Sequence, residues 1–163
     1  MPNAAANARK ATYVPQGENE LVITRTFNAP RRLVFDAHTN PKHIVKWMLG
    51  PAGWTMPICD VDLRKGGKWH FVWKKEPGEE MAMNGEYREV DPPKRIVNTE
   101  SWGPQYPETL NTTEFTESGG KTTMRLTILY PSKEARAQAL KTGMAEGVDM
   151  SYDRLDTLLE SIS

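Results

Sequence analysis

The sequence predicts an α+β domain in which a curved antiparallel sheet of about seven strands wraps around a long C-terminal helix. Three observations carry this prediction: a series of strands with alternating polarity, two short helices after the first strand, and a terminal helix with an apolar stripe. The 163 residues fit one domain. Residues 1–17 are small and polar without an apolar period, and we expect a flexible arm or edge extension there. The domain itself is predicted over residues 18–163.

The first strand and the two short helices follow from local signals. Glu20 to Asn28 alternates apolar and polar side chains, as expected for a strand with one buried face. Pro30 then suits the first turn of a short helix. Asn40 and Pro41 are an N-cap and first-turn pair, and they predict a second short helix that ends near Trp47.

The middle of the chain consists of alternating segments separated by turn residues. The turns contain Gly66-Gly67 and Gly119-Gly120, because hairpins need the positive φ that glycine tolerates. The predicted strands are 56–63, 68–74, 81–90, 96–102, 109–116 and 122–130. The sequence therefore predicts a sheet with one apolar face, which another layer must cover.

The last segment has the features of the covering helix. Ser132 is the predicted N-cap, and Gly143 is predicted to kink or break the helix, which runs to about Ser161. After Gly143 the helix is roughly 28 Å long. Its apolar residues recur at steps of three and four and form one stripe: Met144, Val148, Tyr152, Leu155, Leu159 and Ile162.

Composition excludes several functional classes. The formal net charge is zero, which argues against nucleic acid or an anionic membrane as the main partner. Cys59 is the single cysteine, so neither an internal disulfide nor a cysteine zinc cluster is expected. The three histidines lack metal-ligand spacing, and no phosphate loop or nucleophile elbow occurs, so we expect no metal and no cofactor. Without a signal peptide or a long apolar run, we expect a cytoplasmic protein that does not cross a membrane.

Seven short segments, in order along the chain, resemble one known superfamily. They are Phe27-Asn28-Ala29-Pro30 with Val34-Phe35, Asn40-Pro41 with Trp47, Asp62-Leu63-Arg64-Lys65-Gly66-Gly67, Asn84-Gly85-Glu86-Tyr87-Arg88-Glu89-Val90, Pro93-Lys94-Arg95-Ile96, Gly143-Met144-Ala145-Glu146-Gly147 and Arg154-Leu155. The chain resembles the START-like (SRPBCC) helix-grip superfamily over about residues 20 to 160. Within it, the chain is similar to the bacterial branch related to the C-terminal domain of the activator of the ninety-kilodalton heat-shock ATPase.

The resemblance implies a ligand cavity between the sheet and the terminal helix. Members of the superfamily include lipid and hormone carriers, polyketide cyclases and aromatases, so the fold alone does not select a function. We expect binding of a small hydrophobic or aromatic molecule. A cyclase- or hydrolase-type enzyme and a chaperone partner in a stress response are alternatives. Exposed sheet edges and the N-terminal arm also offer surfaces for a homodimer.

The candidate site combines aromatic, methionine and small residues on facing elements. The expected ligand-binding residues are Trp47, Trp54, Trp69, Phe71, Trp73, Met81, Met83, Glu100, Trp102, Met144, Gly147, Val148 and Tyr152. Trp and Met suit the wall of an apolar cavity, yet ordinary core packing would bury the same residues. Likewise, Gly147 either leaves room for a ligand or allows close helix–sheet packing.

Two polar groups have their own alternatives. Glu100 is a buried acid or base if its strand face points inward, and a solvated surface group if it points outward. Asp62 and Arg64 share a strand face, where they bind an anion or form a structural ion pair. The enzyme alternative requires at least two of Glu100, Asp62 and Tyr152 within hydrogen-bond reach inside the pocket.

Overall fold

A computed structural model describes residues 10–162 of the chain. It contains one antiparallel sheet in the order β1-β2-β8-β7-β6-β5-β4-β3. The strands are β1 (Thr12–Gln16), β2 (Glu20–Phe27), β3 (Trp54–Val61), β4 (Lys68–Lys75), β5 (Glu79–Asp91), β6 (Arg95–Glu100), β7 (Thr109–Ser118) and β8 (Lys121–Leu129). The helices are α2 (Arg31–Thr39), α3 (Pro41–Trp47), α4 (Lys133–Lys141) and α5 (Met144–Ile162).

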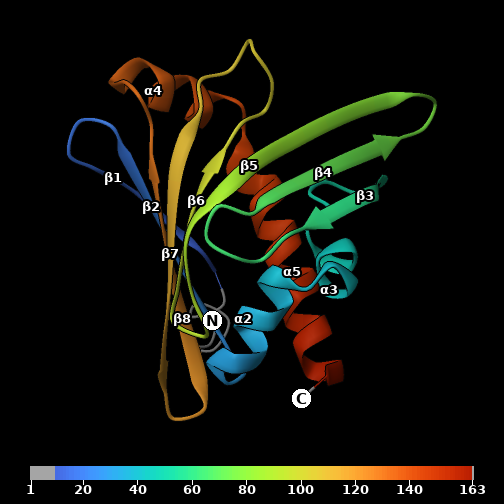
Figure 1. Cartoon of the computed structure of the whole chain (residues 1–163), viewed down its shortest axis with the longest axis vertical. Coiled ribbons are helices and arrows are strands. Elements are labelled where there is room, and N and C mark those ends of the chain that lie inside the picture. Colours follow the sequence, from blue (N-terminus) through green and yellow to red (C-terminus); the bar gives the residue numbers. More distant parts are fainter. Residues whose placement is uncertain (1–9, 163) are drawn as a thin grey trace, which may run out of the picture.

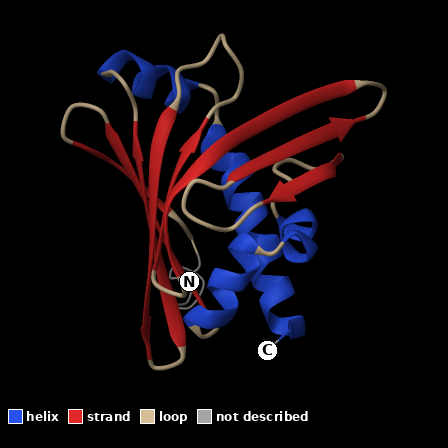
Figure 2. Ribbon diagram, viewed as in Figure 1, coloured by secondary structure: helices blue, strands red, loops and turns tan. Residues whose placement is uncertain are grey.

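The sheet bends around α5, which confirms the predicted architecture. Strands β1, β2, β8, β7 and β6 lie on one side of the helix, and the β3–β4–β5 end of the sheet turns toward its other side (Figure 1). The long β5 joins the two parts, and its pairing with β6 shifts register between Tyr87 and Glu89. Such a bulge bends a strand and increases its twist. The helices are therefore gathered inside the curve of the sheet, except for α4 near its rim (Figure 2).

Strand β1 is an edge extension of the sheet, one of the two alternatives for residues 1–17, and not a flexible arm. It pairs with β2 from Thr12 to Gln16 and adds an eighth strand at the sheet edge. A side chain also attaches this strand to α5: the Tyr13 hydroxyl donates a hydrogen bond of 2.8 Å to Asp149. Pro15 is tolerated because an edge strand leaves part of its backbone unpaired. Residues 1–9 of the predicted arm lie outside the described residues.

The predicted helix signals are confirmed. The Asn40 side chain accepts a hydrogen bond from the backbone of Lys42, with Pro41 in the first turn of α3. Ser132 caps α4 in the same way. Gly143 has a φ of +74° and separates α4 from α5, because this left-handed conformation favours glycine and ends a helix. Because of this break, α5 runs in a different direction from α4 and packs inside the curve of the sheet (Figure 1).

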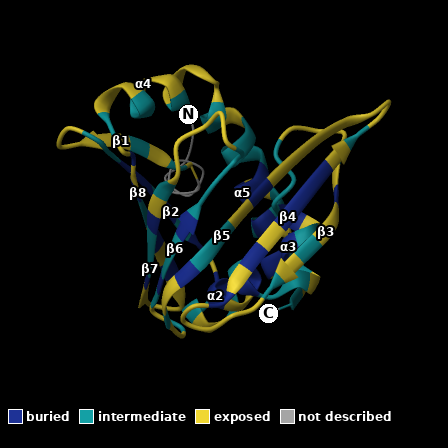
Figure 3. Ribbon diagram, turned by 45° about the horizontal axis from the view of Figure 1, so that its top comes forward, coloured by how far each residue is buried: buried dark blue, intermediate teal, exposed yellow. Residues whose placement is uncertain are grey.

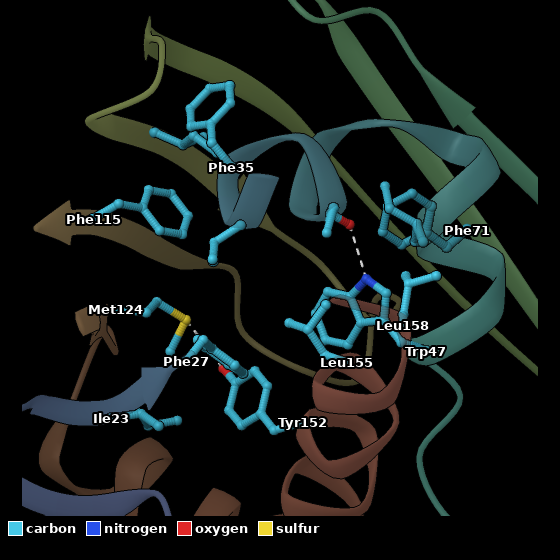
Figure 4. Packing of buried hydrophobic residues seen from close by; sticks show 14 of the residues in the cluster. Ile23, Phe27, Phe35, Trp47, Phe71, Phe115, Met124, Tyr152, Leu155 and Leu158 are labelled. Carbon is cyan, nitrogen blue, oxygen red and sulfur yellow. Dashed lines mark hydrogen bonds between the residues drawn. The ribbon is translucent and has the colours of Figure 1, made fainter. Parts of the chain in front are cut away.

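The interior between the sheet and α5 is fully buried at one end, here called the closed end, and only partly buried at the other. The C-terminal half of α5 carries all of its buried residues, which are Ser151, Tyr152, Leu155, Leu158 and Leu159. In contrast, residues 144–150 of α5 include none that are buried (Figure 3). At the closed end Phe27, Trp47, Phe115 and Tyr152 pack with leucines of α5 (Figure 4). The Trp47 indole N–H donates to the carbonyl of Ala37 at 2.8 Å and so remains satisfied within this core.

Arg25 attaches α5 to the sheet. Its side chain is almost fully buried, lies on the inner face of β2, and pairs with Asp156 at 2.7 Å and Asp153 at 3.5 Å. The guanidinium also lies 4.8 Å from the ring centre of Phe27. Together with the bond from Tyr13 to Asp149, these contacts fix one side of α5 along strands β1 and β2.

Candidate functional site

The aromatic strand face predicted on β4 points inward. Trp69, Phe71 and Trp73 are all buried, and their rings form a continuous row with centroid separations of 4.8 and 6.0 Å. Their partners on β5 are Gly85, Met83 and Met81, in that order. Met83 is buried, but Met81 is 43% exposed because it lies near the far end of the β4–β5 hairpin. The predicted wall is thus assembled, with Met81 at its rim.

Gly85 makes room for Trp69. A Cβ atom at this position would overlap the Thr99 carbonyl and lie 2.7 Å from the Trp69 ring. The glycine therefore permits the indole to cross the neighbouring strand, as aromatic residues often do over strand glycines. The Trp69 indole N–H is buried without a hydrogen-bond partner among the described residues.

Trp73 and Trp102 form a stacked pair at the other end of this row. Their ring centroids lie 5.5 Å apart with an interplanar angle of 13°. The Trp73 indole N–H donates to the Met48 carbonyl at 2.8 Å, and that of Trp102 donates to Glu100 Oε2 at 3.0 Å. Trp73 is buried and Trp102 half-buried, so the pair runs from the core toward the surface.

Glu100 lies at the centre of a polar network on the inner sheet face. Its Oε1 accepts a hydrogen bond of 3.1 Å from the Asn111 amide, while Trp102 donates to Oε2. The Thr109 hydroxyl donates to the Asn111 carbonyl oxygen at 3.0 Å and so fixes the orientation of the amide. Burial raises the pKa of the Glu100 carboxyl, whereas the hydrogen bonds from Trp102 and Asn111 oppose that shift. The inward alternative for Glu100 is therefore the one observed.

The charge of Glu100 contributes to the raised pKa values of two tyrosines. Burial, together with the Glu100 charge, raises the pKa of Tyr130 to about 12. Burial also raises the pKa of Tyr152, with a smaller contribution from Glu100. The Tyr130 hydroxyl lies 4.0 Å from the Met144 sulfur, which brings the first turn of α5 next to the end of β8. These phenols stay neutral at physiological pH and leave Glu100 as the acidic group on this part of the inner face.

The remaining predicted site residues are divided among several places. Trp47 and Tyr152 stack at 6.0 Å in the closed core, and Trp54 lies beside Lys75 at the β3 edge. Gly147 faces the loop before β3, since a Cβ there would lie 3.3 Å from the Pro51 side chain. Met144 and Val148 are half-buried on the N-terminal half of α5.

Two hollows in the described residues bear on the site. The larger, about 440 Å³ and open to solvent, is lined by Thr99, Leu110 and Leu129, whose side chains lie on the sheet face turned away from α5, and it reaches Thr109 and Tyr130 beside the Glu100 network. The smaller, about 20 Å³, is lined by Asn28, Asp156, Leu159 and Glu160. Neither is lined by a predicted ligand-binding residue.

Sequence reasoning missed Thr109, Asn111 and Tyr130. Their signal was present in the alternation of β7 and β8, which places these polar side chains on the same face as Phe115 and Met124. Asp62 and Arg64 form an exposed ion pair of 3.0 Å, the structural alternative for these two residues.

The comparisons with known proteins agree with the fold. The family described as "Activator of Hsp90 ATPase homolog 1-like protein" matches residues 28–160. The chain belongs to this family. Its fold is one suited to hydrophobic ligands, although no ligand is named by the match. No curated protein matches the chain.

Solved structures of several other proteins share the fold. A Rhodobacter sphaeroides protein is 26% identical with a TM-score of 0.88, over 94% of this chain and 100% of that one. A Mycobacterium smegmatis protein is 28% identical with a TM-score of 0.80, over 91% and 96% of the two chains. A Staphylococcus epidermidis protein is 28% identical with a TM-score of 0.79, over 91% and 93%.

Two absences within residues 10–162 concern metals and membranes. Within that range, no three His, Cys, Asp or Glu side chains are grouped to hold a metal ion. None of its helices has the length and apolar character needed to span a bilayer.

Proposed function

We propose that the chain binds a small hydrophobic or aromatic molecule between the inner face of the sheet and the N-terminal half of α5. The observation that carries the proposal is the half-buried state of Glu100, Trp102, Met144 and Val148 at this end of the interior. At the closed end, the facing residues of sheet and helix are buried against one another. Apolar walls with a few fixed polar groups are the usual features of small-molecule sites.

The aromatic and methionine side chains supply the wall that such a ligand needs. The Trp73–Trp102 stack provides flat apolar surface, and Met83 and Met144 provide flexible side chains that adapt to different shapes. Glu100, held by Trp102 and Asn111, supplies the oriented polar group. The proposed ligand is therefore mainly apolar and carries one polar end.

Blocking variants test this location. We expect N-phenylnaphthylamine, a neutral apolar dye, to bind the chain and to quench Trp fluorescence by energy transfer. Val148→Trp fills the proposed site and should weaken dye binding at least about tenfold, because the indole ring occupies the space that the dye needs. Leu110→Trp fills the hollow on the opposite sheet face and should leave binding unchanged.

The controls for this experiment are thermal unfolding and a second variant. Both tryptophan variants must unfold cooperatively near the wild-type temperature. Trp102→Ala, which removes part of the site wall instead of filling the site, should also weaken binding of the dye. Loss of binding in Leu110→Trp with retention in Val148→Trp would place the ligand on the outer face and refute the proposal.

The alternatives of the sequence analysis receive less support. For the enzyme, no hydrogen bond joins any two of Glu100, Asp62 and Tyr152: Asp62 pairs with Arg64, and the Tyr152 hydroxyl lies 3.6 Å from the Met124 sulfur. The chaperone-partner alternative rests on the family description alone, and ATPase stimulation of a purified chaperone is its test. Sedimentation analysis tests the homodimer prediction, for which the edge strands β1 and β3 are the available surfaces.

A further inference from the structure

Glu100 is a half-buried carboxyl whose neighbours are neutral donors. Its two oxygens accept from the Trp102 indole and the Asn111 amide, and none of the ion pairs within residues 10–162 includes Glu100. Other half-buried or exposed acids in the chain do have cations, such as Asp156 with Arg25 and Glu114 with Arg95. A partly buried carboxylate without a cation is costly, so this position is unlike an ordinary structural acid.

The hydrogen bonds around Glu100 also leave acceptor capacity unused. An ionised carboxylate offers about four acceptor positions, and the two donors occupy one on each oxygen. Thr109 fixes Asn111, and the stack with Trp73 fixes Trp102, so the carboxyl is held in place before any ligand arrives. Such preorganisation lowers the cost of binding.

Aromatic side chains surround the same carboxyl. Trp102 contacts Glu100 directly, and Trp73 stacks on Trp102. Thr109 on β7 is paired with Glu100, and Tyr130 lines the same hollow as Thr109. Carboxylates and electron-rich rings both attract organic cations, and together they form the aromatic cages that bind alkylammonium groups. An anionic ligand would instead be repelled by the unpaired acid.

We infer that Glu100, Trp102 and Tyr130 form a subsite for the ammonium end of an apolar or aromatic amine. This inference rests on the proposed function and names its ligand class. The cation pairs with Glu100 and lies against the rings, while the apolar body extends along Trp73, Met83 and the N-terminal half of α5. Glu100 is then the residue that selects among hydrophobic molecules.

Three matched compounds test the inference by displacement of N-phenylnaphthylamine. They are phenylpropyl-trimethylammonium, its carbon isostere with a tert-butyl group in place of the ammonium, and phenylpropanol. We expect the wild-type chain to bind the ammonium compound about tenfold more tightly than the isostere, a preference of about 1.4 kcal/mol. Glu100→Gln should abolish this preference and leave the affinity for the isostere within about twofold of wild type.

Glu108→Gln is the matched control, because Glu108 is exposed beside the outer hollow and the variant changes the net charge by the same amount. It should keep the ammonium preference. A wild-type preference for the isostere or for phenylpropanol, or a preference that survives in Glu100→Gln, would overturn the inference. Equal losses of all three compounds in Glu100→Gln would also overturn it, since Glu100 would then act only by holding Trp102.

Failure of the inference is distinguishable from failure of the proposed function. If the dye binds and Val148→Trp blocks it while the three compounds show no selectivity, the site stands and only the ammonium class is wrong. If neither the dye nor any compound binds in a saturable manner, both are wrong.

Discussion

Protonation of His38 should destabilise the chain on mild acidification. The His38 Nδ1 donates to the Val34 carbonyl at 2.8 Å, which leaves the lone pair on Nε2. That Nε2 atom is buried without a partner among the described residues, and the ring lies 5.0 Å from Trp47 and 5.1 Å from Phe115. Burial lowers the pKa of His38 to about 4, although the hydrogen bond to Val34 acts in the opposite direction.

The sign and size of the effect follow from proton linkage. Between the unfolded pKa near 6.5 and the folded value near 4, the unfolded chain binds a proton that the native chain does not. The free energy of unfolding therefore falls as the pH falls through this window. For His38 alone, the loss between pH 7.5 and pH 5.5 is about 1.3 kcal/mol, and it approaches about 3.4 kcal/mol below pH 4.

Urea unfolding of wild type and His38→Phe at pH 7.5 and 5.5 measures this contribution. Phenylalanine preserves an aromatic ring among its neighbours but cannot be protonated. All other ionisable groups are common to both proteins, so their contributions cancel in the difference. We expect the wild type to lose about 1.3 kcal/mol more than the variant. Equal pH dependence in the two proteins would show that His38 is not buried in its neutral form.

Three other substitutions test the packing. Gly85→Ala should cost at least about 3 kcal/mol in urea unfolding, because its Cβ meets backbone and an indole ring, whereas Gly78→Ala, with open space around it, should stay within about 0.5 kcal/mol. Arg25→Met should cost about 2–3 kcal/mol by leaving carboxylates of α5 unpaired, while Arg64→Met, which breaks an exposed pair, should cost less than about 1 kcal/mol. Tyr13→Phe should cost about 1 kcal/mol and increase amide exchange in β1, and unchanged exchange would mean that its hydroxyl does not hold that strand.

Local patterns were sufficient for most elements. Alternating polarity identified the strands from β2 to β8, paired glycines identified the turns before β4 and β8, and the spacing of apolar residues identified α5. These signals lie within short windows, where side-chain direction follows directly from the backbone period. For the segment that contains β1, the sequence left a flexible arm and an edge extension as alternatives, because the hydrogen bond that holds Tyr13 reaches Asp149, far away in the sequence.

The candidate site was predicted less completely, for the same reason. The inward direction of Trp69, Phe71 and Trp73 follows from alternation, but the partners of Glu100 depend on the register between β6 and β7. That register places Thr109 opposite Glu100 and Asn98 opposite Asn111, and no local pattern determines it. Exposure likewise depends on tertiary position, so Met81 shares the face of Met83 and still reaches solvent.

The attachment of α5 divides the molecule into two regions with different freedom to change. Arg25 and the buried leucines hold the C-terminal half of the helix, so substitutions there act on folding. The first half of the helix begins after the break at Gly143 and contributes no fully buried residue. On the proposed function, substitutions at Met144 and Val148 should therefore alter which molecule is bound at less cost to stability than substitutions in the C-terminal half. If the proposed function holds, a scaffold arranged in this way would let the binding half of the helix change while the other half retains the fold.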